Sequence, residues 1–159
     1  MGLEDLIFGF GKVTLCNVVS AGASFCTQAA LNYASVNFLN RTDLSYYTTL
    51  IGKGVGLASF AAAYYVLNWN RFRQEGGFVR EVAPYLFGIL AIEVLAYYHT
   101  AKYIDKLMNS DYTPLMATLK GEGTIFGIKT ALLYVASKVF HFDKMALGRG
   151  IYRKITHKS

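Results

Sequence analysis

Long apolar stretches with almost no charge recur four times along the chain. Residues 13–39 and 54–70 contain no charged side chain, residues 82–101 contain only Glu93, and residues 123–142 contain Lys129 and Lys138. A helix that crosses a membrane needs about 20 mostly apolar residues, within a range of roughly 17–25. The pattern therefore predicts an all-α, polytopic helical membrane protein with four transmembrane helices and a basic tail over residues 143–159. Three spans are the alternative, because the two lysines weaken the fourth stretch.

The composition agrees with a membrane location. Apolar residues make up 53% of the 159 residues and charged residues only 16%, whereas an ordinary soluble domain has roughly 25% charged residues. The length predicts a single domain over residues 1–159. An unusually apolar soluble protein is the other possibility. It is disfavoured because core helices of soluble proteins carry a polar face, and the uncharged stretches leave few such faces.

The first apolar stretch is uncharged but contains many polar side chains, which are Asn17, Ser20, Ser24, Thr27, Gln28 and Asn32. Polar groups facing lipid on all sides have no hydrogen-bond partners, so a helix of this kind needs protein neighbours. We expect this helix to lie inside a bundle or against another protein.

Glu93 lies about midway along the third stretch, where an ionised carboxylate is costly and a functional role is the default hypothesis. Three roles compete. In the first, Glu93 pairs with Lys129 of the antiparallel fourth stretch, which lies at a matching depth. In the second, Glu93 stays protonated, or bonds to Tyr97 or another subunit. In the third, Glu93 carries protons or ions, but Lys129 and Lys138 are nine residues apart and so point to opposite helix faces, which does not line a single pore.

Small residues recur at a spacing of four, which places them on one helix face and lets a partner backbone approach closely. Gly52 and Gly56 form one G-x-x-x-G pair, and Gly123 and Gly127 form a second. These four glycines are predicted to serve helix packing.

Basic residues predict both the topology and a lipid-binding surface. With four spans, nine Lys and Arg residues lie on the side of the two termini and five on the other. The positive-inside rule then places both termini on the cytoplasmic or matrix side. Anionic phospholipid of the cardiolipin type is the expected partner of this side, and nucleic acid is not expected, because the charge is divided among segments next to the membrane. The predicted lipid-binding residues are Arg71, Arg73, Arg80, Arg149, Arg153 and Lys154.

Residues with catalytic or metal-binding chemistry form no recognisable motif. Cys16 and Cys26 lie about 15 Å apart on a helix and cannot form a disulfide with each other. His99, His141 and His157 have no metal-ligand partner at helical spacing. We therefore expect no catalytic residue, metal or cofactor.

These features favour a non-catalytic accessory subunit of a large membrane complex, contributing helix packing and lipid contacts. The mitochondrial inner membrane, with its respiratory-chain and ATP synthase complexes, is the favoured location. Glu4 and Asp5 near the N-terminus are not typical of a cleavable leader. A small ion, proton or solute transporter that uses Glu93 is the alternative, and a membrane enzyme is the least favoured class.

Overall fold

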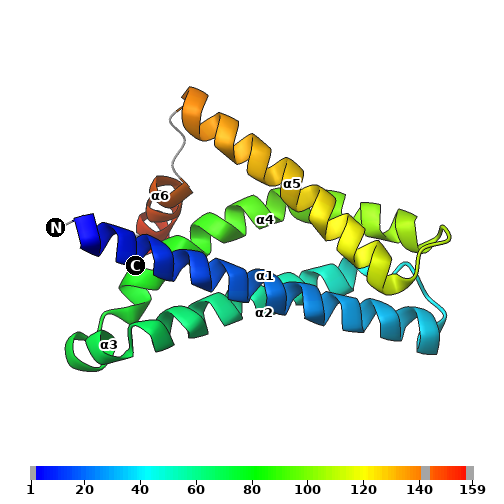
Figure 1. The fold of residues 1–159 in the computed structure, drawn as a ribbon, viewed down its shortest axis with the longest axis horizontal. Coiled ribbons are helices and arrows are strands. Elements are labelled where there is room, and N and C mark those ends of the chain that lie inside the picture. The colour runs from blue at the N-terminus through cyan, green and yellow to red at the C-terminus, as the bar shows by residue number, and fades with distance from the viewer. Residues whose placement is uncertain (1–2, 141–143, 157–159) are drawn as a thin grey trace.

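The computed structural model describes residues 3–140 and 144–156, and within these residues the fold is entirely helical (Figure 1). The predicted all-α class is confirmed for this part of the chain. The helices are α1 (Leu3–Leu39), α2 (Ser45–Leu67), α3 (Trp69–Glu75), α4 (Phe78–Met108), α5 (Pro114–Phe140) and α6 (Lys144–Thr156).

The four long helices α1, α2, α4 and α5 run up and down alternately, and α1 and α2 form an antiparallel pair along most of their length (Figure 1). They converge at the end of the bundle that holds the α1–α2 and α4–α5 turns, where Thr42 donates a hydrogen bond of 2.9 Å to Asn109. Toward the other end, α5 diverges from α1. That end carries α3, α6 and both ends of the chain.

Local sequence explains where the helices begin and end. Asn40, with a φ of 55°, turns the chain between α1 and α2, and Gly76 and Gly77, with φ values of 68° and 78°, turn it between α3 and α4. Asparagine and glycine tolerate this left-handed region better than other residues. In the connection between α1 and α2, Arg41 donates hydrogen bonds to Asp43, and this contact lowers the pKa of the Asp43 carboxyl below its usual value.

The bundle buries polar side chains beside an apolar core that includes Phe60 and Ile104, and it also exposes many large apolar side chains. Gln28, Asn32, Thr49, Thr100 and Thr118 are completely buried. Large apolar side chains face outward on all four long helices, for example at Val18, Leu50, Leu95 and Leu132. A soluble monomer rarely exposes so much contiguous apolar surface. This distribution fits a bundle that is surrounded by lipid or by other apolar helices.

The α1–α2 contact is built on the first pair of glycines. A Cβ atom at Gly52 would lie 2.9 Å from the Ser24 carbonyl oxygen, and one at Gly56 would lie 3.0 Å from the Ser20 carbonyl oxygen. Ser20 also donates a hydrogen bond of 2.7 Å to the Gly56 carbonyl. The predicted packing role of Gly52 and Gly56 is therefore seen within the chain itself.

The polar face of α1 continues this contact toward the converging end of the bundle. Gln28 donates to the Thr49 hydroxyl. Asn32 accepts a hydrogen bond of 2.5 Å from Thr48 on α2 and donates one of 2.8 Å to Thr118 on α5. Ser20, Gln28 and Asn32 of the polar first helix therefore find partners inside the bundle, and one asparagine connects three helices.

Several predicted boundaries differ from the observed ones. The second stretch, predicted at 54–70 with an earlier start near Tyr46 as the alternative, is a helix over Ser45–Leu67, which fits the earlier start, and the helix ends before Asn68 and α3. The fourth, predicted at 123–142, begins at Pro114, nine residues earlier. The predicted stretches are defined by their lack of charge, so they begin directly after Lys53 and Glu122. The helices continue through these two residues because Lys53 and Glu122 pair with each other inside the bundle.

Part of the predicted basic tail forms α6. This helix packs against α4, where Gly148 approaches the Pro84 carbonyl and Tyr152 lies against Phe87 with ring centroids 6.3 Å apart. His141 and residues 157–159, including His157, lie outside the described residues.

Among the described residues, α2 is the one helix that is long and apolar enough to cross a membrane by length and composition alone. The apolar third stretch, residues 82–101, covers only part of α4, and α5 carries several charges. The four-span arrangement stays a prediction.

Gly52→Ala tests the close α1–α2 contact. The added methyl group would be forced against the Ser24 backbone, so we expect the unfolding free energy in detergent to fall by about 1–3 kcal/mol. Gly54→Ala is the matched control, because a Cβ at Gly54 meets nothing within 4 Å. It should be neutral or stabilising by up to about 1 kcal/mol. Equal unfolding midpoints for the two variants, followed by circular dichroism, would contradict the contact.

Candidate functional site: a buried charge network beside a cavity

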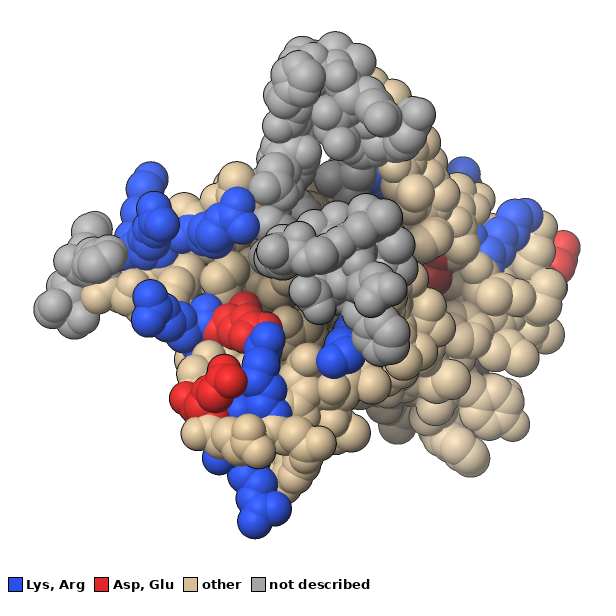
Figure 2. Space-filling model, turned by 60° about the vertical axis from the view of Figure 1, so that its left-hand side comes forward, with Lys and Arg blue, Asp and Glu red and all other residues tan. Residues whose placement is uncertain are grey.

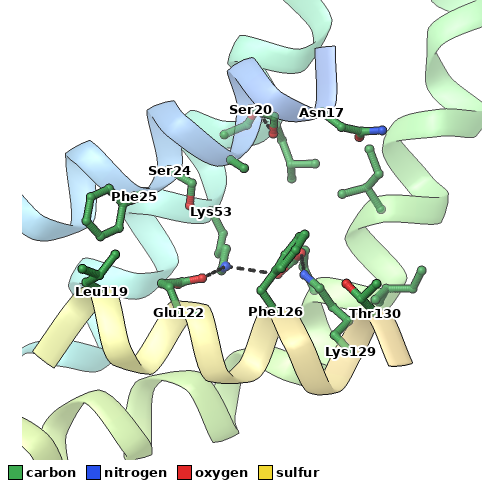
Figure 3. A pocket seen from close by; sticks show the side chains of 17 residues that line it. Asn17, Ser20, Ser24, Phe25, Lys53, Leu119, Glu122, Phe126, Lys129 and Thr130 are labelled. Atoms are coloured by element: carbon green, nitrogen blue, oxygen red, sulfur yellow. Dashed lines mark hydrogen bonds and ion pairs between the residues drawn. The ribbon is translucent and has the colours of Figure 1, made fainter. Parts of the chain in front are cut away.

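Four charged side chains, Lys53, Glu93, Glu122 and Lys129, meet between α2, α4 and α5, and Figure 3 shows three of them labelled beside the cavity. Lys53 of α2 lies 2.7 Å from Glu122 of α5 and 3.4 Å from Glu93 of α4. Lys129 of α5 contacts Glu93 directly through Oε1. Each of these side chains is 15–18% exposed. Glu93 is therefore held between two lysines that come from different helices.

The network balances its own charge. Two ammonium groups face two carboxylates, so no charge in the group lacks an opposite partner. Removing ions from water is costly, and paired ions are retained in an apolar setting only when the geometry compensates for that loss. The network thus fixes the relative positions of α2, α4 and α5, while α1 contributes neutral polar groups.

The predicted contact between Glu93 and Lys129 is present in the structure. The alternative contact between Glu93 and Tyr97 is not formed, because the Tyr97 hydroxyl donates a hydrogen bond of 2.9 Å to the Tyr46 carbonyl. Sequence reasoning missed Lys53 and Glu122 because each lies one residue before a predicted span. One signal was available: Glu122 and Lys129 are seven residues apart, which is close to two turns, so they share a helix face.

A cavity of about 560 Å³ adjoins the network, where α5 diverges from α1 (Figures 1 and 3). Its volume lies within the range of about 300–1,000 Å³ that is usual for small-molecule sites. The uncharged polar side chains that line it are Asn17, Ser20, Ser24 and Thr130. The large apolar side chains that line it are Phe25, Leu57, Ile89, Ile92, Leu119 and Phe126.

Some polar atoms around the cavity have no hydrogen-bond partner among the described residues. They are Ser24 Oγ, Glu93 Oε2 and Glu122 Oε1. Lys129 donates a hydrogen bond to Glu93, and its ammonium group has two further donors. Because buried polar groups are normally satisfied by protein or by ordered water, this cavity suits water or a small polar molecule.

No group of three His, Cys, Asp or Glu side chains among the described residues is arranged to hold a metal ion. Cys16 is buried and Cys26 is exposed, and both are free thiols. His99 is exposed and lies against the ring of Tyr98.

The second pair of predicted packing residues behaves differently from the first. A Cβ at Gly123 or Gly127 would meet nothing within 4 Å, so neither glycine is in close helix contact within the described chain. Gly123 borders the cavity instead. Their predicted packing role is not seen among the described residues and stays a prediction, because α5 leaves the bundle at this point.

The predicted lipid-binding residues lie at the end of the bundle that carries α3 and α6. Figure 2 shows Lys and Arg side chains outnumbering Asp and Glu on this side. Arg71 is partly engaged, because it donates to Glu81, which also accepts a hydrogen bond from Tyr64. Arg73 and Arg80 belong to α3 and α4, and Arg149, Arg153 and Lys154 belong to α6.

Comparison with known proteins gives no relative. No protein-family model matches the chain, and no curated protein and no solved structure is significantly similar to it. A function for this chain therefore rests on its own residues and their geometry.

Glu93→Gln tests the network. Losing this carboxylate leaves Lys129 without its partner and gives the group a net positive charge, so the unfolding free energy should fall by about 3–5 kcal/mol. The double variant Glu93→Gln/Lys129→Gln keeps the balanced pair of Lys53 and Glu122 and should recover most of the loss. Glu75→Gln, at an exposed position, is the control and should change little. If the double variant were less stable than Glu93→Gln, the charge-balance account would be wrong.

Proposed function

We propose that this chain is a multi-pass, non-catalytic subunit of a membrane complex, with α1, α2, α4 and α5 as its spanning helices. The observation that carries the proposal is the combination of buried asparagine, glutamine and threonine side chains inside the bundle with many large apolar side chains exposed on its outside. Association of helices in lipid relies on small residues and interhelical hydrogen bonds. The α1–α2 contact is made of these two elements.

Helix length supports the spanning role. An α-helix rises 1.5 Å per residue, so the 23 residues of α2 extend over about 35 Å, against a hydrocarbon core of about 30 Å. The helices α4 and α5 are longer. Their central charges are compensated by one another, which lowers the cost of placing Glu93, Glu122 and Lys129 within lipid.

An uncovered face of α5 supports membership of a complex. Gly123 and Gly127 leave a shallow surface that no described helix contacts closely, and Leu119 and Phe126 on the same side of α5 are exposed. This combination suits close approach by a helix of another subunit. The basic end with α3 and α6 would face the matrix if the host is the mitochondrial inner membrane, in line with the positive-inside rule.

Gly127→Leu tests the proposed partner face. A leucine at this position has room within the chain but would keep a partner helix away. We expect the unfolding midpoint of the isolated protein to change little, while its migration on a native gel shifts from a complex of high mass to a free subunit. Gly54→Leu, on an open position of α2, is the control and should leave the complex intact.

Carbonate extraction of the host membranes provides the accompanying check. The native protein should stay in the membrane pellet. Release into the supernatant would contradict the spanning role, and migration of the native protein as a monomer would contradict the subunit role.

A small solute or proton carrier is the second candidate, and the cavity beside Glu93 is the observation that favours it. The pairing of Glu93 with two lysines favours a structural role, because an ion carrier needs a group that is free to exchange its partner. Purified protein in vesicles should therefore give no proton flux above empty vesicles. A flux that the Glu93→Gln variant abolishes would favour the carrier.

A further inference from the structure

A second pocket lies at the basic end of the bundle, where the N-terminal part of α1 meets the junction of α2 and α3. Its volume is about 350 Å³. The polar residues that line it are Lys12, Asn68, Trp69, Asn70 and Arg71. Among the residues that the structure describes, the two cations Lys12 and Arg71 border this pocket and no carboxylate does, so the described lining is positively charged.

The break between α2 and α3 at Asn68 forms part of the pocket and holds Lys12 beside it. Asn68 interrupts the helix and donates a hydrogen bond of 2.9 Å to the Tyr64 carbonyl. Its side-chain oxygen accepts a hydrogen bond of 3.2 Å from Lys12 Nζ. The Trp69 ring is held edge-on against Tyr65, with centroids 5.1 Å apart. Lys12 and Trp69 are thus held at the pocket by their contacts with Asn68 and Tyr65.

Hydrogen-bond donors exceed acceptors in this pocket. The Lys12 ammonium has three N–H donors and gives one to Asn68. Arg71 has five and uses Nη2 for Glu81, with its guanidinium lying 4.9 Å from the Phe72 ring centroid. The Trp69 indole N–H adds another donor. An arrangement of cationic donors around one pocket calls for an anion with several acceptor oxygens, and a phosphate group meets that need.

The surroundings of the pocket favour a phosphate that is attached to apolar chains. Val66, which also borders it, is 68% exposed, and the Trp69 side chain is 47% exposed. Tryptophan is enriched at the level of lipid headgroups. A free phosphate ion would use the cations but would leave these apolar side chains in water.

We propose that this pocket binds the phosphate of an anionic phospholipid headgroup, with Lys12 and Arg71 as its cationic contacts and Trp69 as its indole donor. The site rests on the proposed membrane location and narrows the broad basic surface to one position. Lys12 was expected to matter only for topology, and Arg73 does not line the pocket.

The chain offers a direct probe, because Trp69 is its single tryptophan. The full-length protein would be placed in nanodiscs of phosphatidylcholine containing a small fraction of phosphatidylglycerol with brominated acyl chains, and the Trp69 fluorescence measured. Bromine quenches tryptophan at short range, so a bound lipid quenches more than its mole fraction predicts. Brominated phosphatidylcholine at the same fraction is the lipid control and should quench only in proportion to its abundance.

Two variants that each remove one positive charge distinguish binding in the pocket from attraction by the overall charge at this end of the bundle. A charge-assisted hydrogen bond contributes about 1.5–3 kcal/mol, so Lys12→Gln should raise the phosphatidylglycerol fraction needed for half-maximal quenching by about 10-fold or more. Arg73→Gln removes the same charge from α3 outside the pocket and should raise it by less than about 2-fold.

Three results would overturn the site. Equal quenching by the two brominated lipids would show no preference for an anionic headgroup. Equal effects of Lys12→Gln and Arg73→Gln would show a diffuse surface in place of a pocket. Reversal of quenching by millimolar inorganic phosphate would show a free-anion site. Failure of the membrane proposal gives a different signature, because neither brominated lipid would then quench Trp69 and the protein would separate from the nanodiscs.

Discussion

The need to satisfy polar groups inside a bundle with an apolar exterior governs this fold. Buried hydrogen-bonding groups that lack partners are costly, and lipid or apolar protein outside offers them none. The chain responds by directing its polar side chains toward one another. Asn32 joins α1 to α2 and α5, and Lys53 and Glu93 join α2 to α4 and α5. Hydrogen bonds and charge pairs therefore act together with the apolar contacts around Phe60 and Ile104 to set the helix positions.

The same requirement explains the two different roles of the glycine pairs. Gly52 and Gly56 remove side chains where α1 must come close enough for the Ser20 hydroxyl to reach a backbone carbonyl. Gly123 and Gly127 have the same spacing but lie where α5 leaves the bundle and borders the cavity. A motif of small residues therefore marks a surface that permits close approach, and the tertiary structure decides whether the partner belongs to the same chain.

Sequence reasoning reached the helical class, the burial of several polar side chains of the first helix against neighbouring helices and the contact between Glu93 and Lys129. It did so because helical periodicity and depth along a helix can be read directly from residue numbers. The ends that it preferred for α2 and α5 were wrong because Lys53 and Glu122 look like boundaries when each charge is judged alone. Their compensation depends on three helices meeting, which a linear pattern does not encode. The cavity and the pocket near Lys12 were missed for the same reason, since both arise from helix divergence and from the break at Asn68.

The equal number of ammonium and carboxylate groups in the central network has an electrical consequence. A membrane potential does work of about 2.3 kcal/mol on each elementary charge moved through 100 mV. Displacing Lys53, Glu93, Glu122 and Lys129 together moves no net charge, so the field of an energised membrane exerts no net force on the set. In the proposed membrane setting, moving this network as one body would therefore not couple the bundle to voltage, whereas separating or reorienting the opposite charges would.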